Sequence, residues 1–182
     1  MHLSQLRLLA ATAVALSASR LDGQTIRDRS QGERESFDSK VAAARHDLIG
    51  VWRVARFCLT DSLNAQYEPF RNAAGYFVYT AGGRLSLQFG PGPGSRPLSP
   101  AELARLPLSP AERPSYERGY VAYFGTYTVT SESTLVHHVE GGTIAAYVGT
   151  DQRRPFRISG VRRDTLAVGD MAPGCRVLVR LE

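Results

Sequence analysis

Short runs of alternating apolar and polar residues recur from Leu48 to the C-terminus of this 182-residue chain. Alternation with a period of two is typical of half-buried β-strands, because successive side chains of a strand point to opposite faces. Turn residues separate the runs, and Gly82-Gly83 favours a tight hairpin. The runs are LIGVWRVARFCLT, GYFVYT, RLSLQFG, FGTYTVT, TLVHHVEG, AAYVGTDQRRPFRISG, TLAVGD and CRVLVRL.

About eight strands with mostly short turns between them predict an all-β fold, either an antiparallel up-and-down barrel or a sandwich. The barrel is favoured because the first and last runs have similar amphipathic character and can pair with each other. The chain has 43% hydrophobic residues and is long enough to bury one good core. We therefore expect a single folded domain.

Two helical segments interrupt the strand pattern. Residues 90–119 are rich in proline and glycine, and Ser99 and Ser109 each precede a proline at the first position of a predicted short helix. We interpret this insertion between strands as a lid over the barrel mouth; a surface excursion without a ligand role is the alternative. A short helix at the base of the fold is predicted by apolar residues at helical spacing, namely Phe37, Val41, Ala44 and Leu48.

The N-terminus has the features of a signal peptide. Arg7 precedes an apolar run from Leu8 to Ala18, which small residues and then a polar segment follow. The run is shorter than the about 20 residues that a membrane-spanning helix needs. We therefore expect export to the periplasm or the medium. The predicted parts are a signal peptide at 1–19, a flexible leader and short helix at 20–47 and the barrel domain at 48–182.

The net charge of +5 comes almost entirely from arginine, since Lys40 is the only lysine. The arginines are scattered among acids, whereas nucleic-acid binding favours a basic stripe interleaved with exposed aromatic residues. We therefore expect no nucleic-acid partner. A solvated strand face explains the one weak cluster, which consists of Arg153, Arg154, Arg157, Arg162 and Arg163.

The chain has two cysteines, Cys58 at the end of the first run and Cys175 at the start of the last. First and last strands are neighbours in a closed barrel, and disulfides are stable in exported proteins. A disulfide between Cys58 and Cys175 is therefore one expectation. Two buried free thiols are the alternative, because sequence spacing does not prove pairing.

Gly50-Val51-Trp52, which opens the first run, is similar to the G-x-W of the lipocalin group. Five segments in order, LIGVWRVARF, GYFVYTAGGRLSLQ, YVAYFGTYTV, LVHHVEGG and YVGTDQRRPFRISG, resemble the bacterial and fungal lipocalin-like domain family over residues 48–182. The resemblance implies a calycin-type barrel, with Trp52 closing one end, that holds a small and largely apolar molecule.

The His-His-x-Glu motif is the strongest candidate for chemistry. In a strand, His138 and Glu140 share one face and His137 lies on the other, so an interior position of the first face creates a polar site in an apolar cavity. If Trp52 also points inward, steps of two place Arg56 inside, where it needs an anionic partner. The predicted ligand-binding set, completed by antiparallel pairing, is Arg56, Ser86, Gln88, Tyr123, His138, Glu140, Gln152 and Arg154.

Three roles are open for this cluster: a structural network, ligand recognition, or acid and base catalysis by His138 and Glu140. We favour a protein that binds a small hydrophobic or amphipathic molecule, with an isomerase-like or cyclase-like enzyme as the alternative. The orientation of His138 discriminates between them. His137 and His138 point to opposite faces and cannot share a metal ion, and no phosphate-binding glycine loop is present, so no metal or cofactor is expected.

Overall fold

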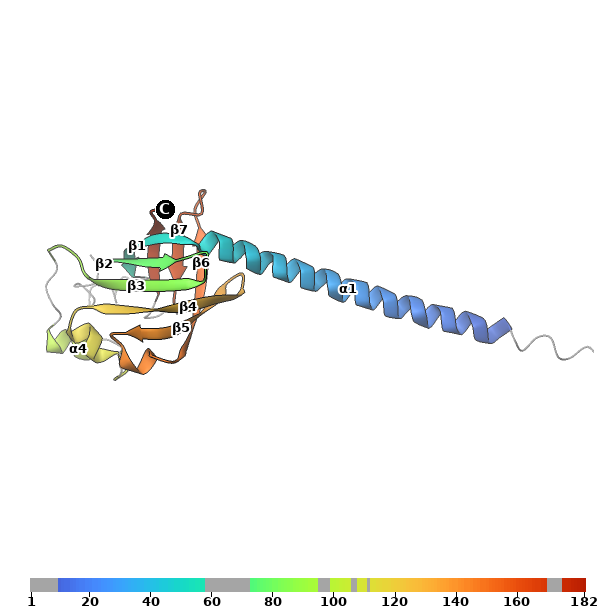
Figure 1. The fold of residues 1–182 in the computed structure, drawn as a ribbon, viewed down its shortest axis with the longest axis horizontal. Coiled ribbons are helices and arrows are strands. Elements are labelled where there is room, and N and C mark those ends of the chain that lie inside the picture. The colour runs from blue at the N-terminus through green and yellow to red at the C-terminus, as the bar shows by residue number, and fades with distance from the viewer. Residues whose placement is uncertain (1–9, 58–72, 95–98, 106–107, 111, 170–174) are drawn as a thin grey trace, which may run out of the picture. The chain divides into compact units, whose positions relative to one another are not determined.

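The computed structural model describes residues 10–57, 73–94, 99–105, 108–110, 112–169 and 175–182. The chain forms two compact units, residues 1–40 and 41–182, and each is described by itself. Figure 1 shows the strands wound into a barrel and the 39-residue helix α1 (Ala10–Leu48), of which residues 41–48 belong to the barrel unit. None of the helices in these described ranges is long and apolar enough to cross a membrane.

Eight strands form a closed barrel in which each pairs antiparallel with the next and β8 pairs with β1. This confirms the up-and-down barrel predicted from the alternating runs. The strands are β1 (Gly50–Phe57), β2 (Ala73–Tyr79), β3 (Arg84–Pro91), β4 (Val121–Ser131), β5 (Thr134–Gly142), β6 (Asp151–Ser159), β7 (Thr165–Val168) and β8 (Arg176–Arg180).

Side-chain alternation places the core inside the barrel. On β3, Leu85, Leu87 and Phe89 are buried, and the residues between them are exposed. The turn from β2 to β3 is the predicted hairpin: Gly83 has a φ of 78°, a conformation that glycine adopts without steric cost. The run at 145–160, predicted as one strand, forms two elements: the 3-10 helix η1 (Ala145–Tyr147) comes first and β6 follows it.

The insertion between β3 and β4 contains the two predicted short helices, α4 (Pro100–Arg105) and α5 (Arg113–Glu117). The Ser99 hydroxyl and N–H each donate to Glu102 Oε2 at 2.7 Å, so a capping box starts α4 where the sequence predicted. The second helix begins at Arg113 instead of Pro110, because Pro114 lies in its first turn, where a fixed φ favours helix initiation.

Helix α1 is longer than the short helix expected from the apolar spacing, and it continues through the segment that the sequence indicated as a polar leader. Within the helix, local bonds such as Gln31 Nε2 to Glu35 Oε1 at 3.0 Å favour the helical conformation. Its C-terminal end has the expected packing: Ala44 and Leu48 are buried in the barrel core, and Val41 packs against it. Phe37, in contrast, is 51% exposed.

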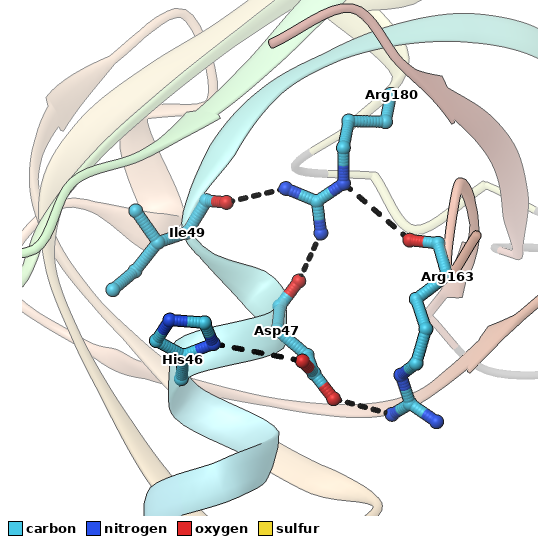
Figure 2. Close-up of polar contacts among 5 residues, drawn as sticks. All are labelled: His46, Asp47, Ile49, Arg163 and Arg180. Carbon is cyan, nitrogen blue, oxygen red and sulfur yellow. Dashed lines mark hydrogen bonds and ion pairs between the residues drawn. The ribbon is translucent and has the colours of Figure 1, made fainter.

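One end of the barrel is closed by Trp52, Arg180 and the last turn of α1. Figure 2 shows the polar contacts of Arg180 at this end. Trp52 is fully buried, and its Nε1 donates to the Leu48 carbonyl at 2.8 Å. The Arg180 guanidinium lies 4.1 Å from the Trp52 ring centroid and donates to the carbonyl oxygens of Asp47 and Ile49, the latter at 2.6 Å. A cation is favourable here because the last carbonyls of a helix lack intrahelical partners and have partial negative charge.

An ion pair also ties this end of the barrel to the turn between β6 and β7. Asp47 Oδ2 lies 2.7 Å from Arg163 Nη2, and Arg180 Nε donates to the Arg163 carbonyl at 3.4 Å. Cys175, at the start of the last strand, is 1% exposed and disulfide-bonded. Cys58 lies outside the described residues, so the Cys58–Cys175 pairing itself stays a prediction.

We expect the Arg180→Met substitution to lower the free energy of unfolding by about 2–4 kcal/mol. The substitution removes charge-assisted hydrogen bonds, each of about 1.5–3 kcal/mol, and a cation–π contact of about 0.5–2 kcal/mol. Urea unfolding followed by fluorescence of Trp52, the single tryptophan, measures the change. Arg162→Met removes an exposed arginine next to the same turn and serves as the control. Equal stability of the two variants would contradict this account.

Candidate functional site

His137 is the polar centre of the barrel interior. Among the described residues, the buried polar or charged side chains are Ser115 and His137, and His137 is 1% exposed. The Tyr79 hydroxyl lies 3.0 Å from His137 Nε2, and the Tyr123 hydroxyl lies 2.8 Å from His137 Nδ1. Tyr79 is on β2 and His137 on β5, which are not adjacent strands, so this hydrogen bond crosses the barrel interior.

Local strand geometry brings these side chains together. On β4, Tyr123, Gly125 and Tyr127 alternate on the inner face, and the pairing of β4 with β5 is irregular between Phe124 and Gly125. A Cβ at Gly125 would lie 2.0 Å from the backbone oxygen of His138, so only glycine permits this approach of the two strands. The Tyr127 ring then packs edge-on against Tyr79 at 5.1 Å.

Hydrogen counting shows that the interior has a spare donor. Neutral imidazole supplies one N–H and one lone pair, and the two tyrosines supply two O–H groups. Two of these three hydrogens make the two bonds of the Tyr79–His137–Tyr123 cluster. Whichever tautomer is present, one tyrosine hydroxyl keeps a proton for a further acceptor.

The cluster is uncharged at neutral pH. Burial, aided by the positive charge of Arg154 and by His138, lowers the pKa of His137 from 6.5 to about 3. Burial likewise raises the pKa of Tyr79 well above its ordinary value, and it raises the pKa of Tyr123. These shifts follow from the cost of placing charge in a low-dielectric interior.

Arg154 and Gln152 extend the cluster on the inner face of β6. Arg154 Nη2 donates to Gln152 Oε1 at 3.3 Å, and the guanidinium lies 5.6 Å from the Tyr147 ring centroid. Tyr147 also contacts Tyr123 edge-on at 6.2 Å and donates its hydroxyl hydrogen to Glu112 Oε1 at 2.6 Å. A polar path therefore runs from the helical insertion to the centre of the barrel.

Glu112 is held in this path as a carboxylate. Burial alone would raise the pKa of Glu112, but hydrogen bonds from Tyr147 and Ser109 outweigh it and lower that pKa. The insertion is also tied to the loop after β5, since the Ser115 hydroxyl donates to the Thr143 carbonyl at 2.7 Å. The role of the insertion as a lid stays a prediction.

The predicted inward orientation of His138 and Glu140 is wrong. His138 pairs with Asp151 and His137 with Gln152, one residue away from the register that the sequence suggested, and a shift of one residue exchanges the two faces. Glu140 is exposed on the outer wall, where it accepts a bond from Arg84 at 2.9 Å. An acid and base role for these two residues inside the barrel therefore loses its geometric basis.

Three more predicted residues lie on the outer wall. Ser86 and Gln88 are exposed because β3 buries its leucines and Phe89 instead. Arg56 is exposed because the pairing of β1 with β8 shifts between Val54 and Arg56, which interrupts the alternation counted from Trp52. Tyr123, Gln152 and Arg154 do lie on the inner face, as predicted.

The predicted ligand-binding set did not contain His137, Tyr79 or Tyr147. On β5, Leu135 and Val139 share a face with His137, whereas His138 shares its face with the charged Glu140. The apolar neighbours of His137 were therefore the sequence signal for its burial. Two apolar partners at a period of two indicate the buried face more reliably than a carboxylate does. Tyr79 reaches the cluster across the interior, and sequence spacing holds no signal for such a contact.

On the outer wall, Thr128, His138 and Asp151 have the distances of a nucleophile, base and acid. Asp151 Oδ1 lies 2.6 Å from His138 Nδ1, and Thr128 Oγ1 lies 3.0 Å from Nε2. The His138 and Asp151 side chains are 37% and 70% exposed, and the surrounding strand N–H groups are used by the sheet. Without free donors for an oxyanion, we interpret this set as a surface network.

A separate pocket of about 440 Å³ lies where β6 passes the turn between β4 and β5. Pro155, Phe156 and Ile158 from β6 line it, together with Ala167 from β7 and Ser133 from the turn. None of the predicted ligand-binding residues lines this pocket. Across the ranges that the structure describes, no group of three histidine, cysteine or acidic residues could hold a metal ion.

His137 makes stability depend on pH in a predictable direction. Because its pKa is about 3 in the folded protein and 6.5 without burial, protonation below pH 6.5 favours the unfolded chain. We expect the wild-type protein to lose up to about 1.4 kcal/mol of unfolding free energy for each pH unit below 6.5, relative to His137→Gln. Urea unfolding of both proteins at several pH values measures this difference. Parallel pH profiles would show that the ring is not held neutral.

The sequence itself matches a known family over most of the barrel. The lipocalin-like domain family matches residues 49–173, a range that contains β1 to β7 and the whole Tyr79–His137–Tyr123 cluster. No curated protein sequence matches the chain. Because the family match covers more than half of the 182 residues and the barrel has the expected strand order, this chain belongs to the lipocalin-like domain family.

Proposed function

We propose that this chain is an exported protein that binds a small hydrophobic or amphipathic molecule inside its barrel. The observation that supports it best is the cluster of Tyr79, His137, Tyr123 and Arg154 on an otherwise apolar interior wall. Ligand sites of this kind combine apolar walls with a few convergent polar groups that fix the orientation of the ligand.

The spare hydroxyl hydrogen favours ligand binding over a purely structural network. A network that exists only to fix strand register is most stable when its donors and acceptors balance. The Tyr79–His137–Tyr123 cluster has one donor more than it uses. A bound molecule with a carbonyl, carboxylate or other acceptor would satisfy it.

An isomerase-like or cyclase-like enzyme is the less favoured function. His138 was its candidate base, and His138 faces outward with both ring nitrogens hydrogen-bonded. The interior histidine, His137, is also hydrogen-bonded at both nitrogens, and its low pKa makes it a weak base.

Export is proposed from the apolar run at Leu8 to Ala18 and the small residues after it. The test is expression of the full chain in an exporting bacterial host, followed by N-terminal sequencing of the protein outside the cytoplasm. We expect the mature N-terminus to lie between Ala18 and Gln24. An intact N-terminus on protein confined to the cytoplasm would overturn the export proposal.

Native mass spectrometry of the exported protein tests the binding proposal. We expect a retained small molecule, or a thermal shift with members of a library of fatty acids, terpenoids and aromatic polyketides, since ligands that bind the folded state stabilise it. Recovery of no molecule together with no thermal shift would contradict the proposal.

Two tyrosines of one strand provide a matched test of the site. Tyr79→Phe removes a hydroxyl from the interior, and Tyr76→Phe removes one from the exposed face of β2. We expect Tyr79→Phe to weaken binding of the best library compound about two- to tenfold, the range for one neutral hydrogen bond, and Tyr76→Phe to have no effect. Equal affinities of the two variants would place the ligand elsewhere.

A further inference from the structure

We propose that the molecule bound in the barrel is an organic acid whose carboxylate contacts Arg154 and the spare tyrosine hydroxyl. This inference rests on the proposed binding function and adds the chemical class of the ligand. It follows from where the positive charge of the interior lies and from what surrounds it.

The Arg154 guanidinium has only neutral partners. Among the described residues, it donates to Gln152 Oε1 at 3.3 Å and to the Arg153 carbonyl at 3.5 Å, both long distances for such bonds. It also has hydrogen-bonding interactions with the hydroxyl groups of Tyr123 and Tyr147. The guanidinium also lies over the Tyr147 ring. A guanidinium offers five N–H donors, so these contacts use only part of its capacity.

Two arginines on the outer surface, in contrast, form ion pairs with carboxylates. Arg84 pairs with Glu140 at 2.9 Å, and Arg163 pairs with Asp47 at 2.7 Å. Arg154 is less exposed than either, yet it forms no ion pair with a carboxylate among the described residues. Desolvating a charge without a counter-charge is costly, so a half-buried arginine surrounded by neutral groups indicates that the counter-charge comes from a ligand.

Glu112 is the carboxylate that belongs to the same polar path, but it is already engaged. Tyr147 donates to its Oε1, and the Ser109 N–H and hydroxyl donate to its Oε2 at 2.9 and 2.8 Å. Ser109 and Glu112 thus form a second capping box, which fixes Glu112 at the insertion. The Tyr147 side chain links Glu112 to Arg154 only indirectly.

The spare hydroxyl and the guanidinium converge on one region. The Tyr147 ring lies 5.6 Å from the Arg154 guanidinium and 6.2 Å from the Tyr123 ring, so the three side chains are neighbours. The charge of Arg154 also acts on both Tyr123 and Tyr79, one of which has the hydroxyl hydrogen that the cluster does not use. A carboxylate has two oxygens and about four acceptor positions, so it can accept from the guanidinium and the hydroxyl together. A neutral alcohol or ester would satisfy the hydroxyl but leave the charge of Arg154 without compensation.

The test compares three ligands of equal chain length on the full chain: dodecanoic acid, dodecanol and methyl dodecanoate. Isothermal titration at a pH where the acid is ionised gives the three affinities. We expect the acid to bind about 10- to 100-fold more tightly than the two neutral compounds, the factor that a charge-assisted hydrogen bond provides. Equal affinity for acid and alcohol would overturn the carboxylate assignment while supporting the binding function. Failure of all three to bind, with no molecule retained on purification, would overturn both.

Neighbouring arginines on opposite faces of β6 supply the matched variants. Arg154→Met removes the interior charge, and Arg153→Met removes the adjacent exposed one. We expect Arg154→Met to abolish the preference for the acid without weakening binding of dodecanol, and Arg153→Met to preserve the preference. An acid preference that survives Arg154→Met would assign the carboxylate to another group. The wild-type comparison decides the question even if Arg154→Met does not fold.

Discussion

The closed end of the barrel depends on the Arg180 guanidinium, which lies on the Trp52 ring and donates hydrogen bonds to two main-chain carbonyl oxygens at the end of α1. One side chain thereby joins the last strand, the first strand and the helix that precedes it. The contact uses the planar shape of guanidinium, which can stack on an aromatic ring while it donates at its edge. Ring closure of the sheet is thus reinforced by a polar contact at the point where a hydrophobic core alone would leave helix carbonyls unsatisfied.

The barrel interior, in contrast to this closed end, is apolar almost throughout, and its polar side chains are concentrated in one cluster. Tyr79, His137 and Tyr123 come from three different strands, and Arg154 adds charge from a fourth. Each strand places an inward-facing residue in the cluster through ordinary side-chain alternation. Gly125 permits the close approach of β4 to β5 beside the two histidines of β5. The fold therefore builds the candidate site from strand register, without a dedicated loop.

The fold was predictable because it depends on alternation, which is a local property of sequence. The runs from Leu48 onward predicted the strands, and the family resemblance agreed with them. The site was less predictable because a face is decided by registers and bulges. The register between β5 and β6 differs by one residue from the predicted register, so that His137 faces inward in place of His138. One irregularity in the pairing of β1 with β8 turns Arg56 outward. Contacts across the interior, such as Tyr79 with His137, depend on barrel curvature, which no local pattern encodes.

The neutrality of His137 has a consequence for selectivity. Since neither the histidine nor its tyrosine partners change charge near neutral pH, the charges that act on the cluster come from the guanidinium groups of Arg154 and Arg176 and are positive. Such a fixed positive potential discriminates by repulsion as well as by attraction. Amines and other cations of the same size and hydrophobicity would be rejected from the barrel, and a change of pH within the ordinary range would not admit them.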